Sequence, residues 1–495
     1  MPPRPRKLRR PRPRRSDRLI QVRALLKRPP VTCRAGDSIE AASRLMTGHG
    51  ADAVVVLGAA GQPQGIVTDR DLRERVVAAG RAPAEPVGSV MTSPLVTISP
   101  EASLLDAVLD MTRLGLHHLV VMEGEQLLGV VSGHDLLHLH AAAPVQLARM
   151  IRSARTLDEL APVLPALVEM IRRLFEQGLT GSDIGRIVAE INDHLVRQVL
   201  GQAAEALHES GAEAPPVAYC WLALGSEGRR EQTIRTDQDN ALVYEDPPAG
   251  LRERIQGHLH ALAERTITAL GRLGHPPCPA GFMASNPRWC QPLAAWRGDI
   301  AAWIGEPLAR DHLLYASTCL DFRPVAGSDA LARALRDEVR AQTRAWRSFP
   351  RHLAKVAVSH GPPLGLFGRF VLERQDGARG INIKLNGMLP LVNSLRAYAI
   401  DLGLEETNTL DRLTGSVAAG CFTSAEAEEA RRAYEILFRL RLGHQLDLIA
   451  TGRPPDNFLD PRALDREDQR RLKEAFRIVR RVQGKVAMRY FTEPL

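Results

Sequence analysis

The chain has 495 residues, too many for a single hydrophobic core, so two to four domains are expected. Its content of 44% hydrophobic and 25% charged residues is ordinary for a globular protein, and no apolar run reaches the roughly 18 residues of a membrane span. The net charge of +8 resides in residues 1–15, which contain eight basic residues and no acid, so the rest is neutral overall and nucleic acid is not an expected partner.

The basic segment, residues 1–18, is interleaved with prolines. Such a segment cannot bury apolar area, which predicts a disordered tail. It also lacks the apolar stretch of a secretory signal. The six cysteines are scattered and contain no Cys-x-x-Cys pair, which gives no zinc-site spacing and suits a reducing compartment. We therefore expect a cytoplasmic protein.

An internal repeat follows the tail. Residues 31–72 recur at residues 96–136, with an offset of 65 that becomes 64 after one deleted residue. Each copy predicts a helix, two strands and a second helix. In the first helix of each copy, apolar residues keep the three-to-four spacing of one buried face. They are Ile39, Ala42 and Met46, and then Leu104, Val108 and Met111. Two copies indicate a paired domain rather than a solenoid.

The repeat resembles tandem CBS domains, also called a Bateman module, over residues 19–142. The resemblance implies a homodimer formed through this module, and adenine nucleotide bound by a Thr or Ser together with an Asp three residues later. Thr68 with Asp71, and Ser132 with Asp135, match that pattern. An Asp can accept hydrogen bonds from ribose hydroxyls, and a hydroxyl at a helix start can donate to phosphate. The alternative is that all four residues only cap helices.

Residues 143–212 show the spacing of amphipathic helices, at about residues 161–175 and 184–207. We interpret them as a helical linker.

A strand, a turn and a second strand follow. The apolar runs Val217–Leu224 and Ala241–Tyr244 predict two buried strands. Between them, Gly225 allows the backbone to approach a phosphate closely, and Ser226 adds a hydroxyl.

Two carboxylates accompany the second strand. Asp237 and Asp239 are two residues apart, so they project from one face, about 6 to 7 Å apart at the rise of a strand. Such a pair can hold Mg²⁺ and a nucleotide phosphate.

The order Gly-Ser, spacer, Asp-x-Asp resembles the DNA polymerase β-like nucleotidyltransferase superfamily, and residues 224–240 resemble its branch related to the PII-protein uridylyltransferase. The resemblance implies a domain over residues 213–345 that transfers UMP or AMP from an NTP. Mg²⁺ would bind at Asp237 and Asp239, and Gly225 and Ser226 would hold phosphates. Arg229 either contacts phosphate, which suits its planar fork, or faces solvent.

A third carboxylate is normally required for two-metal transfer. Asp321, in the strand-like run 315–323, is the candidate; its alternative is an ion pair with Arg323. Residues 281–286, where related transferases would carry an acid, offer Asn286 instead.

The last segment, residues 346–495, predicts helices at about residues 385–402, 409–418, 424–450 and 466–490. Strings that include Lys384 and Arg441 resemble the C-terminal domain presumed to bind substrate in this branch. Arg441, His444 and Gln445 share one helix face, which suits either a substrate contact or a buried polar network.

The predicted architecture is therefore multidomain α+β. It comprises a tandem CBS module, a helical linker, a polymerase β-like nucleotidyltransferase domain and an all-α C-terminal domain. The predicted function is a signal-transduction nucleotidyltransferase that uses UTP or ATP and Mg²⁺ on a protein hydroxyl, regulated by adenine nucleotide. One alternative is a non-catalytic adenine-nucleotide sensor on a degenerate transferase scaffold. Another is a transferase acting on a small molecule or tRNA.

Overall fold

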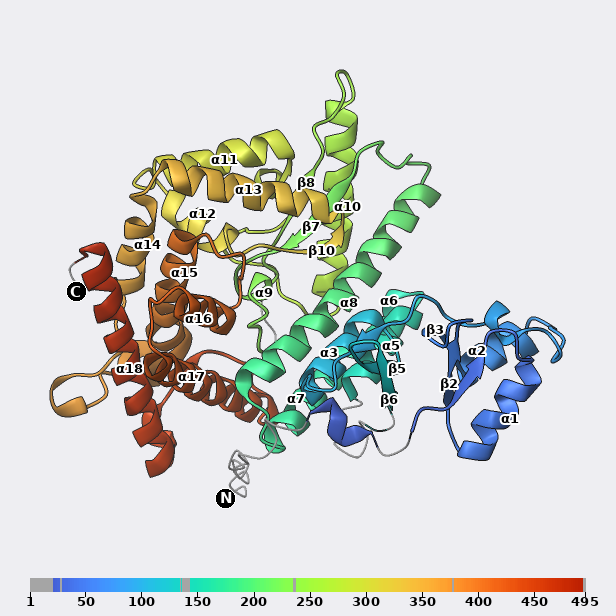
Figure 1. Ribbon diagram of the computed structural model, residues 1–495. Helices are drawn as coiled ribbons and strands as arrows, with labels where there is room; N and C mark the ends of the chain where they lie inside the picture. The colour runs from blue at the N-terminus through green and yellow to red at the C-terminus, as the bar shows by residue number, and fades with distance from the viewer. Residues whose placement is uncertain are drawn as a thin grey trace. The chain divides into compact units, whose positions relative to one another are not determined.

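The computed structural model describes residues 21–26, 29–133, 135, 143–234, 237–375 and 378–492. The predicted basic tail, residues 1–18, lies outside these ranges. The described chain forms two compact units, one within residues 14–150 and the other within residues 151–495 (Figure 1). Within the described ranges, every helix is too short or too polar to cross a membrane.

The smaller unit contains the first copy of the repeat as a three-stranded sheet of order β1-β2-β3. The strands are β1 (Thr32–Arg34), β2 (Ala53–Leu57) and β3 (Pro63–Thr68), with β1 parallel and β3 antiparallel to β2. Helix α1 (Ile39–His49) joins β1 to β2, and α2 (Asp69–Asp71) follows β3 and continues as a π-helix (Leu72–Val77). The predicted α1 face, Ile39, Ala42 and Met46, is buried.

The second copy repeats this sheet with the order β4-β5-β6. Its elements are β4 (Thr97–Ile98), α3 (Leu104–Leu114), β5 (His118–Glu123) and β6 (Gln126–Ser132). Val108 and Met111 are buried in its core, and Leu104 packs against it. The helix predicted after β6 falls mostly on residues outside the described ranges. The two copies have separate cores, as a duplicated domain requires.

The segment predicted as a linker forms α5 (Ala143–Ser153), α6 (Leu157–Leu160), α7 (Val163–Glu176) and α8 (Gly181–Glu209). The two predicted helices correspond to α7 and α8. Helix α8 packs against α10 (Arg252–Arg272) and against β10 (Arg323–Gly327) of the larger unit. It is therefore part of the core of that unit as well as a connection to it.

The larger unit is built on a mixed sheet of order β10-β7-β8-β9. Strand β7 (Tyr219–Ala223) pairs antiparallel with β8 (Asn240–Tyr244) and with β10, and β9 (Cys290–Pro292) is parallel to β8. The two predicted strands are β7 and β8. Helices α10, α11 (Leu293–Gly305), α12 (His312–Cys319) and α13 (Asp329–Ala345) surround the sheet (Figure 1). The interpretation of residues 315–323 as a strand was wrong: α12 ends at Cys319 and β10 begins at Arg323.

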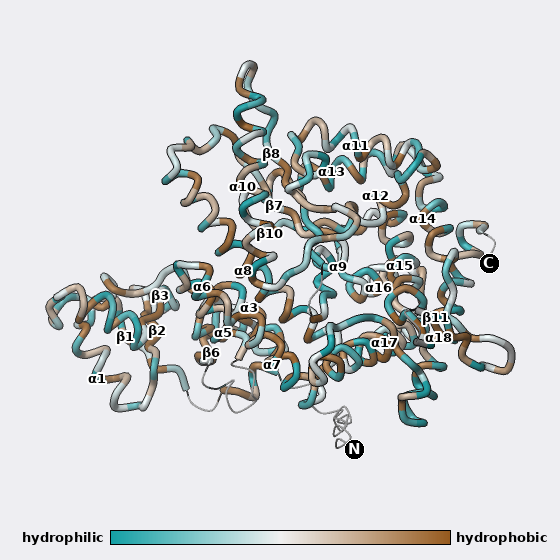
Figure 2. Tube along the Cα trace, turned by 180° about the vertical axis from the view of Figure 1, so that it is seen from behind, coloured by the Kyte–Doolittle hydropathy of each residue, from teal (hydrophilic) through white to brown (hydrophobic). Residues whose placement is uncertain are grey.

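The C-terminal part is mainly helical, with α14 (Phe349–Val358), α15 (Leu389–Leu402), α16 (Thr409–Ala418), α17 (Ser424–Ala450) and α18 (Arg466–Tyr490). It also contains a small sheet of β11 (Glu373–Gln375), β12 (Ala378–Asn382) and β13 (Phe458–Leu459), which the prediction lacked. One hydrophobic core runs from β7 and β8 through α15, α17 and α18. Figure 2 shows hydrophobic and hydrophilic stretches alternating along these helices, as expected of helices around a shared core.

Candidate functional site

The Gly-Ser turn lies directly against Asp239. Helix α9 (Gly225–Gly228) starts immediately after β7, and Gly225 has a φ of +53°. A Cβ at Gly225 would lie 3.2 Å from Oδ2 of Asp239, and the amide of Leu224 donates to the carbonyl of Asp239 at 2.9 Å. Both the left-handed conformation and this close approach favour glycine. The turn and the second aspartate are thus joined, as the motif predicts.

The two aspartates precede β8 instead of lying in it. Along this segment Asp237 is exposed, Gln238 is buried and Asp239 is partly buried, so the alternation expected of extended backbone holds. Gln238 anchors the segment: its amide donates to the carbonyl of Pro276 at 3.0 Å, and its Nε2 donates to the carbonyl of His275 at 2.8 Å. Asp237 and Gln238 both line a small internal pocket, whereas Oδ2 of Asp239 lies against Gly225.

A lysine from the C-terminal part brings positive charge to these carboxylates. Burial raises the pKa of Asp239, and a hydrogen bond from Cys278 and the charge of Lys384 oppose that rise. Lys384 begins the π-helix Lys384–Met388. Burial lowers the pKa of Lys384 to about 8, the charge of Arg441 lowers it further, and the charge of Asp239 works in the opposite direction. The site is therefore formed by residues next to the sheet together with a residue of the C-terminal part.

Asp321 is not available as a metal ligand. Its side chain is 0% exposed, and its two oxygens accept hydrogen bonds from three arginines. The donors are Arg229 Nη1 at 2.8 Å, Arg396 Nη2 at 2.7 Å and Arg412 Nη2 at 2.6 Å. Burial opposes ionisation, but the guanidinium groups of Arg396, Arg412 and Arg229 overcome it and hold the pKa of Asp321 well below its usual range. The expectation of a catalytic Asp321 does not fit this geometry.

The expected roles of Arg229 and Arg323 also need correction. Arg229 is 5% exposed and also donates to Glu231 at 2.8 Å, so it neither faces solvent nor has a free edge for phosphate. Arg323 does not pair with Asp321; it binds Asp193 of α8 through two hydrogen bonds of 2.5 and 2.8 Å. Arg229 therefore forms a buried ion pair with Asp321, and Arg323 forms one with Asp193.

The C-terminal part also holds the end of the turn. The hydroxyl of Thr407 donates to the carbonyl of Gly228 at 2.8 Å, and Asn408 Nδ2 donates to the carbonyl of Arg229 at 2.9 Å. A Cβ at Gly228 would lie 1.8 Å from the backbone oxygen of Asp321, so only glycine fits. These contacts hold the end of the Gly-Ser turn against the C-terminal helices, next to Asp321.

Helix α17 presents Arg441, His444 and Gln445 on one face, as predicted. Nε of Arg441 donates to Oδ1 of Asn457 at 2.7 Å, and His444 pairs with Asp456 at 2.7 Å. Arg441 and Gln445 are buried. These contacts fix the segment before β13, which fits the alternative of a buried polar network.

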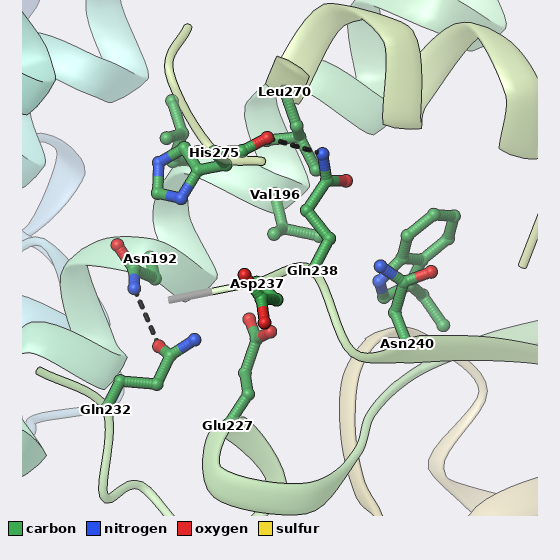
Figure 3. A pocket seen from close by; sticks show the side chains of 11 residues that line it. Asn192, Val196, Glu227, Gln232, Asp237, Gln238, Asn240, Leu270 and His275 are labelled. Carbon is green, nitrogen blue, oxygen red and sulfur yellow. Dashed lines mark hydrogen bonds between the residues drawn. The ribbon is translucent and has the colours of Figure 1, made fainter. Parts of the chain in front are cut away.

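A small internal pocket of about 20 Å³ contains polar residues that the sequence interpretation missed (Figure 3). Glu227 of α9 reaches into it with its carboxylate directed toward that of Asp237. Helix α8 contributes Asn192, whose Nδ2 donates to Oε1 of Gln232 at 2.7 Å. Burial raises the pKa of Glu227 to about 8; the charges of Asp193 and Asp239 add to the rise, and the charge of Arg323 opposes it. The sequence does hint at this pocket: in α8 the polar residues from Glu190 to His194 interrupt the apolar face that the helix buries.

In the smaller unit, both predicted pairs form helix caps. The hydroxyl of Thr68 donates to Oδ2 of Asp71 at 2.7 Å, and the hydroxyl of Ser132 donates to Oδ2 of Asp135 at 2.8 Å. The backbone amides of Thr68 and Ser132 donate to the same carboxylates. The capping interpretation is therefore confirmed, and it leaves room for a second role because a cleft lies beside the caps.

That cleft has a volume of about 560 Å³ and is lined by both copies of the repeat. Thr68, Asp71 and Ser132 line it together with four arginines, Arg70, Arg73, Arg75 and Arg149. In the described part of the chain Arg149 forms no ion pair, whereas Arg70 and Arg75 pair with Glu74 and Asp71. The cleft thus offers hydroxyls, a carboxylate and an available guanidinium.

Comparison with known proteins covers most of the chain. Residues 22–78 and 87–141 match the CBS domain. Residues 166–310 match a family described as "Putative nucleotidyltransferase DUF294", and residues 347–490 match a "Putative nucleotidyltransferase substrate binding domain". The nucleotidyltransferase match begins within α7, which agrees with the packing of α8 on the sheet.

Curated relatives cover a quarter of the chain or less. The CBS domain-containing protein YhcV of Bacillus subtilis is 34% identical over 105 residues, which are 21% of this chain and 74% of the relative. The mitochondrial CBS domain-containing protein CBSX3 of Arabidopsis thaliana is 32% identical over 21% of this chain and 53% of the relative. An uncharacterized protein of Methanopyrus kandleri is 28% identical over 25% of this chain and 63% of the relative. The chain thus spans less than two thirds of the last two relatives.

Solved structures match a similar share. A CBS domain protein of Pyrobaculum aerophilum complexed with AMP is 27% identical, with 25% of this chain and 95% of that chain covered at a TM-score of 0.24. A CBS-domain containing protein of Agrobacterium tumefaciens is 30% identical, with 25% and 96% covered at a TM-score of 0.24. On the family matches and the arrangement of its domains, this chain belongs to the proteins that join a CBS domain pair to the DUF294 nucleotidyltransferase domain and its C-terminal substrate-binding domain.

Proposed function

We propose that the protein transfers UMP or AMP from an NTP to a hydroxyl of a protein acceptor, and that adenine nucleotide bound by the CBS pair regulates the transfer. The observation that carries the proposal is the contact between Gly225 and Asp239, with Asp237 projecting beside it. It places a close-approach turn, two carboxylates and the charge of Lys384 in one place.

The residues present fit Mg²⁺. The candidate ligands Asp237 and Asp239 are carboxylates, and Mg²⁺ is commonly held by one or two carboxylates together with substrate phosphates and water. Within the described ranges no three His, Cys, Asp or Glu side chains form a group that could hold a metal ion, so phosphate and water would have to supply the remaining ligands. When bound, Mg²⁺ would neutralise charge on the triphosphate in the transition state.

The chain itself would bind and orient the nucleotide. The backbone at Gly225 and the hydroxyl of Ser226 would contact the β- and γ-phosphates, and the ammonium of Lys384 would pair with them. The oxygen of the acceptor hydroxyl attacks the α-phosphorus, and the bond to the β-phosphate oxygen breaks, so pyrophosphate leaves. The hydroxyl proton passes to a carboxylate oxygen at the site.

Regulation would start in the cleft of the CBS pair. Thr68 and Ser132 would turn their single hydroxyl hydrogens from Asp71 and Asp135 to phosphate, Asp71 would accept from ribose hydroxyls, and Arg149 would pair with phosphate. Such a ligand controls transfer only if it binds two arrangements of the protein with different affinity. We expect the CBS pair to form a homodimer, which light scattering of the purified protein would measure.

The direct test is incubation of the purified chain with labelled UTP or ATP, Mg²⁺ and candidate acceptor proteins. We expect label on an acceptor with the wild type and none with Asp237→Asn or Asp239→Asn. A preparation that transfers no label from any NTP, and that behaves the same after both substitutions, would defeat the proposal.

The second candidate is a non-catalytic adenine-nucleotide sensor. The observation that favours it is the removal of Asp321 from the set of possible metal ligands by three arginines. Calorimetry separates the two candidates. A sensor binds AMP or ATP in the CBS cleft and shows no Mg²⁺-dependent NTP binding that Asp239→Asn abolishes.

A further inference from the structure

Helix α18 carries a row of four positive charges on its outer face, which we call the basic row. Arg466, Arg470 and Arg477 of this row are exposed, and Lys473 is half-buried. Their spacing of four, three and four residues places all of them on one side of the helix, over about 16 Å at the rise of an α-helix. The opposite side is buried against α14, α15 and α17 (Figure 1).

The acids of α18 do not neutralise the basic row. Glu467 and Asp468 pair with Arg471, and Glu474 pairs with Arg432 of α17. Within the described ranges the four cations of the basic row form no ion pair with any acid. The helix therefore presents its positive charge to solvent, where an acidic partner can reach it.

A groove and a loop lie beside the basic row. The groove has a volume of about 480 Å³ and is lined by four residues of α18: Arg466, Gln469, Arg470 and Lys473. The loop comprises residues 362–371. Its Phe370 ring centre lies 5.1 Å from Nζ of Lys473, and a Cβ at Gly368 would lie 3.3 Å from Nη2 of Arg477. The side chains of the loop are therefore displayed next to the positive charges.

The loop displays Phe367. Its side chain is 98% exposed, and its φ of +58° is a backbone conformation that bulky residues rarely adopt. The amide of Gly365 donates to the carbonyl of Arg369 at 2.8 Å and so closes the loop around Phe367. Val371, at the end of the loop, is 53% exposed. An exposed aromatic ring on a strained backbone indicates a surface that a partner covers.

The charge and the spacing of the basic row indicate the chemistry of that partner. Successive charges are about 5.5 Å apart along the helix axis. Carboxylates at every second residue of an extended chain are about 6.7 Å apart, which is a comparable spacing. An apolar residue of the same chain can then cover Phe367 and Val371. Nucleic acid is less favoured, because the chain after residue 15 has no net positive charge.

The same helix is linked to the candidate nucleotide site. The π-helix Lys384–Met388 packs against α18, and a Cβ at Gly387 would lie 3.1 Å from the ring of Phe476. Lys384, at the start of that π-helix, is the lysine whose charge acts on Asp239. A protein held on the outer face of α18 is therefore held by the part of the chain that also reaches the nucleotide site.

We propose that the basic row and the loop around Phe367 dock an acidic segment of the acceptor protein, with an apolar residue of that segment against Phe367. This inference rests on the proposed function, because it names the class of protein that would present its hydroxyl to the nucleotide.

The test is fluorescence anisotropy of a short labelled peptide, with glutamate at alternate positions and one central leucine, titrated with the full chain. We expect Arg470→Glu to weaken binding about tenfold and Phe367→Ala about fivefold. Arg344→Glu is the matched control for charge, since Arg344 is an exposed arginine of α13 that does not line the groove. Leu308→Ala is the control for apolar exposure, since Leu308 is 78% exposed elsewhere. Both controls should bind like the wild type.

Two changes in the peptide locate its contacts. Exchanging the glutamates for glutamine should abolish binding, because the charges of the basic row lose their partners. Exchanging the leucine for serine should weaken binding to the wild type and have little further effect in Phe367→Ala, because the two changes remove the same contact. Independent, additive losses would show that the leucine does not lie against Phe367, and would overturn that part of the inference.

The outcomes separate this inference from the proposed function. If the wild type does not bind the peptide, or if Arg470→Glu binds it as Arg344→Glu does, the inference is overturned even when labelled nucleotide is transferred. If the peptide binds as expected while no NTP supports transfer, the docking surface stands and the transferase proposal fails.

Two other anionic probes test the choice of partner. They are a labelled single-stranded RNA and vesicles of phosphatidylcholine with phosphatidylserine. Weaker binding of both than of the peptide supports a protein partner. Tighter binding of either one, lost in Arg470→Glu, would assign the surface to nucleic acid or to a membrane and overturn the inference.

Discussion

Arg396 binds Asp321 through both Nε and Nη2, at 3.1 and 2.7 Å, and so ties α15 to the loop before β10. Asp321 is fully buried, and Arg229 and Arg412 complete its shell. This ion cluster joins the nucleotidyltransferase sheet to the C-terminal helices, and the two parts also share one hydrophobic core.

We predict that Asp321→Asn destabilises the fold, because it leaves three buried guanidinium groups without their carboxylate. Removing one partner from a buried ion pair typically costs about 3 to 5 kcal/mol. Urea denaturation would measure the loss. Asp237→Asn is the control, since Asp237 is exposed and its loss should leave the free energy of unfolding unchanged. Equal stability of the two variants would contradict a structural role for Asp321.

Substitution of Gly225 should damage the site more than the fold. Gly225→Ala places a Cβ 3.2 Å from Oδ2 of Asp239 and forces an alanine to a φ of +53°, a strain of roughly 1 to 2 kcal/mol. We expect weaker Mg²⁺-dependent NTP binding by calorimetry. Gly201→Ala in α8 is the comparison, because no atom lies within 4 Å of its Cβ; it should be neutral or slightly stabilising. Unchanged NTP binding in Gly225→Ala would show that the turn does not hold the nucleotide.

Nucleotide affinity should depend on pH through Lys384. Its pKa is about 8, so the ammonium loses its proton as the pH rises through 8, and its attraction for triphosphate disappears. We therefore expect NTP affinity to fall between pH 7 and pH 9. Lys384→Arg should retain affinity across this range because arginine stays protonated. The same fall in Lys384→Arg would assign the titration to another group.

The lowered pKa of Lys384 also affects folding. The charged form is less favourable in the folded state than in the unfolded chain, where the pKa is near 10.5, so stability should rise with pH between about 8 and 10.5. Lys384→Gln should lack this increment in urea denaturation. An identical pH profile for the two proteins would refute the assignment.

The CBS cleft can be tested against a cap of the same geometry elsewhere. Thr68 caps α2 through Asp71 and lines the cleft, whereas Ser103 caps α3 through Asp106 and does not line it. Thr68→Ala and Ser103→Ala should each lose about 1 kcal/mol of stability. Only Thr68→Ala should weaken AMP binding in calorimetry. Equal AMP affinity in the two variants would mean that Thr68 caps α2 and does not bind AMP.

Local patterns in the sequence predicted the helices and strands well. The bounds of α16, α17 and α18 follow the predicted ranges because each begins after a side-chain cap, Asn408, Thr423 or Asp465, and continues with regular apolar spacing. The repeat was equally visible, since the equivalent residues Ala42 and Ala107, and Met46 and Met111, are buried in the two copies.

Long-range charge pairing could not be predicted in the same way. Arg229 and Asp321 are 92 residues apart, and Arg323 and Asp193 are 130 residues apart. Periodicity reports which face of a helix or strand is buried, but it does not say which buried charges meet. For that reason Arg229 was expected at a phosphate and Asp321 at a metal, and Glu227 and α8 were overlooked.

The most direct measurement is a crystal structure of the protein with Mn²⁺ and a non-hydrolysable UTP or ATP analogue, with the ion located by its anomalous scattering. The account predicts Mn²⁺ between Asp237 and Asp239, with the triphosphate against Ser226 and Lys384. An analogue bound only in the CBS cleft, with no anomalous peak at the two aspartates, would contradict it.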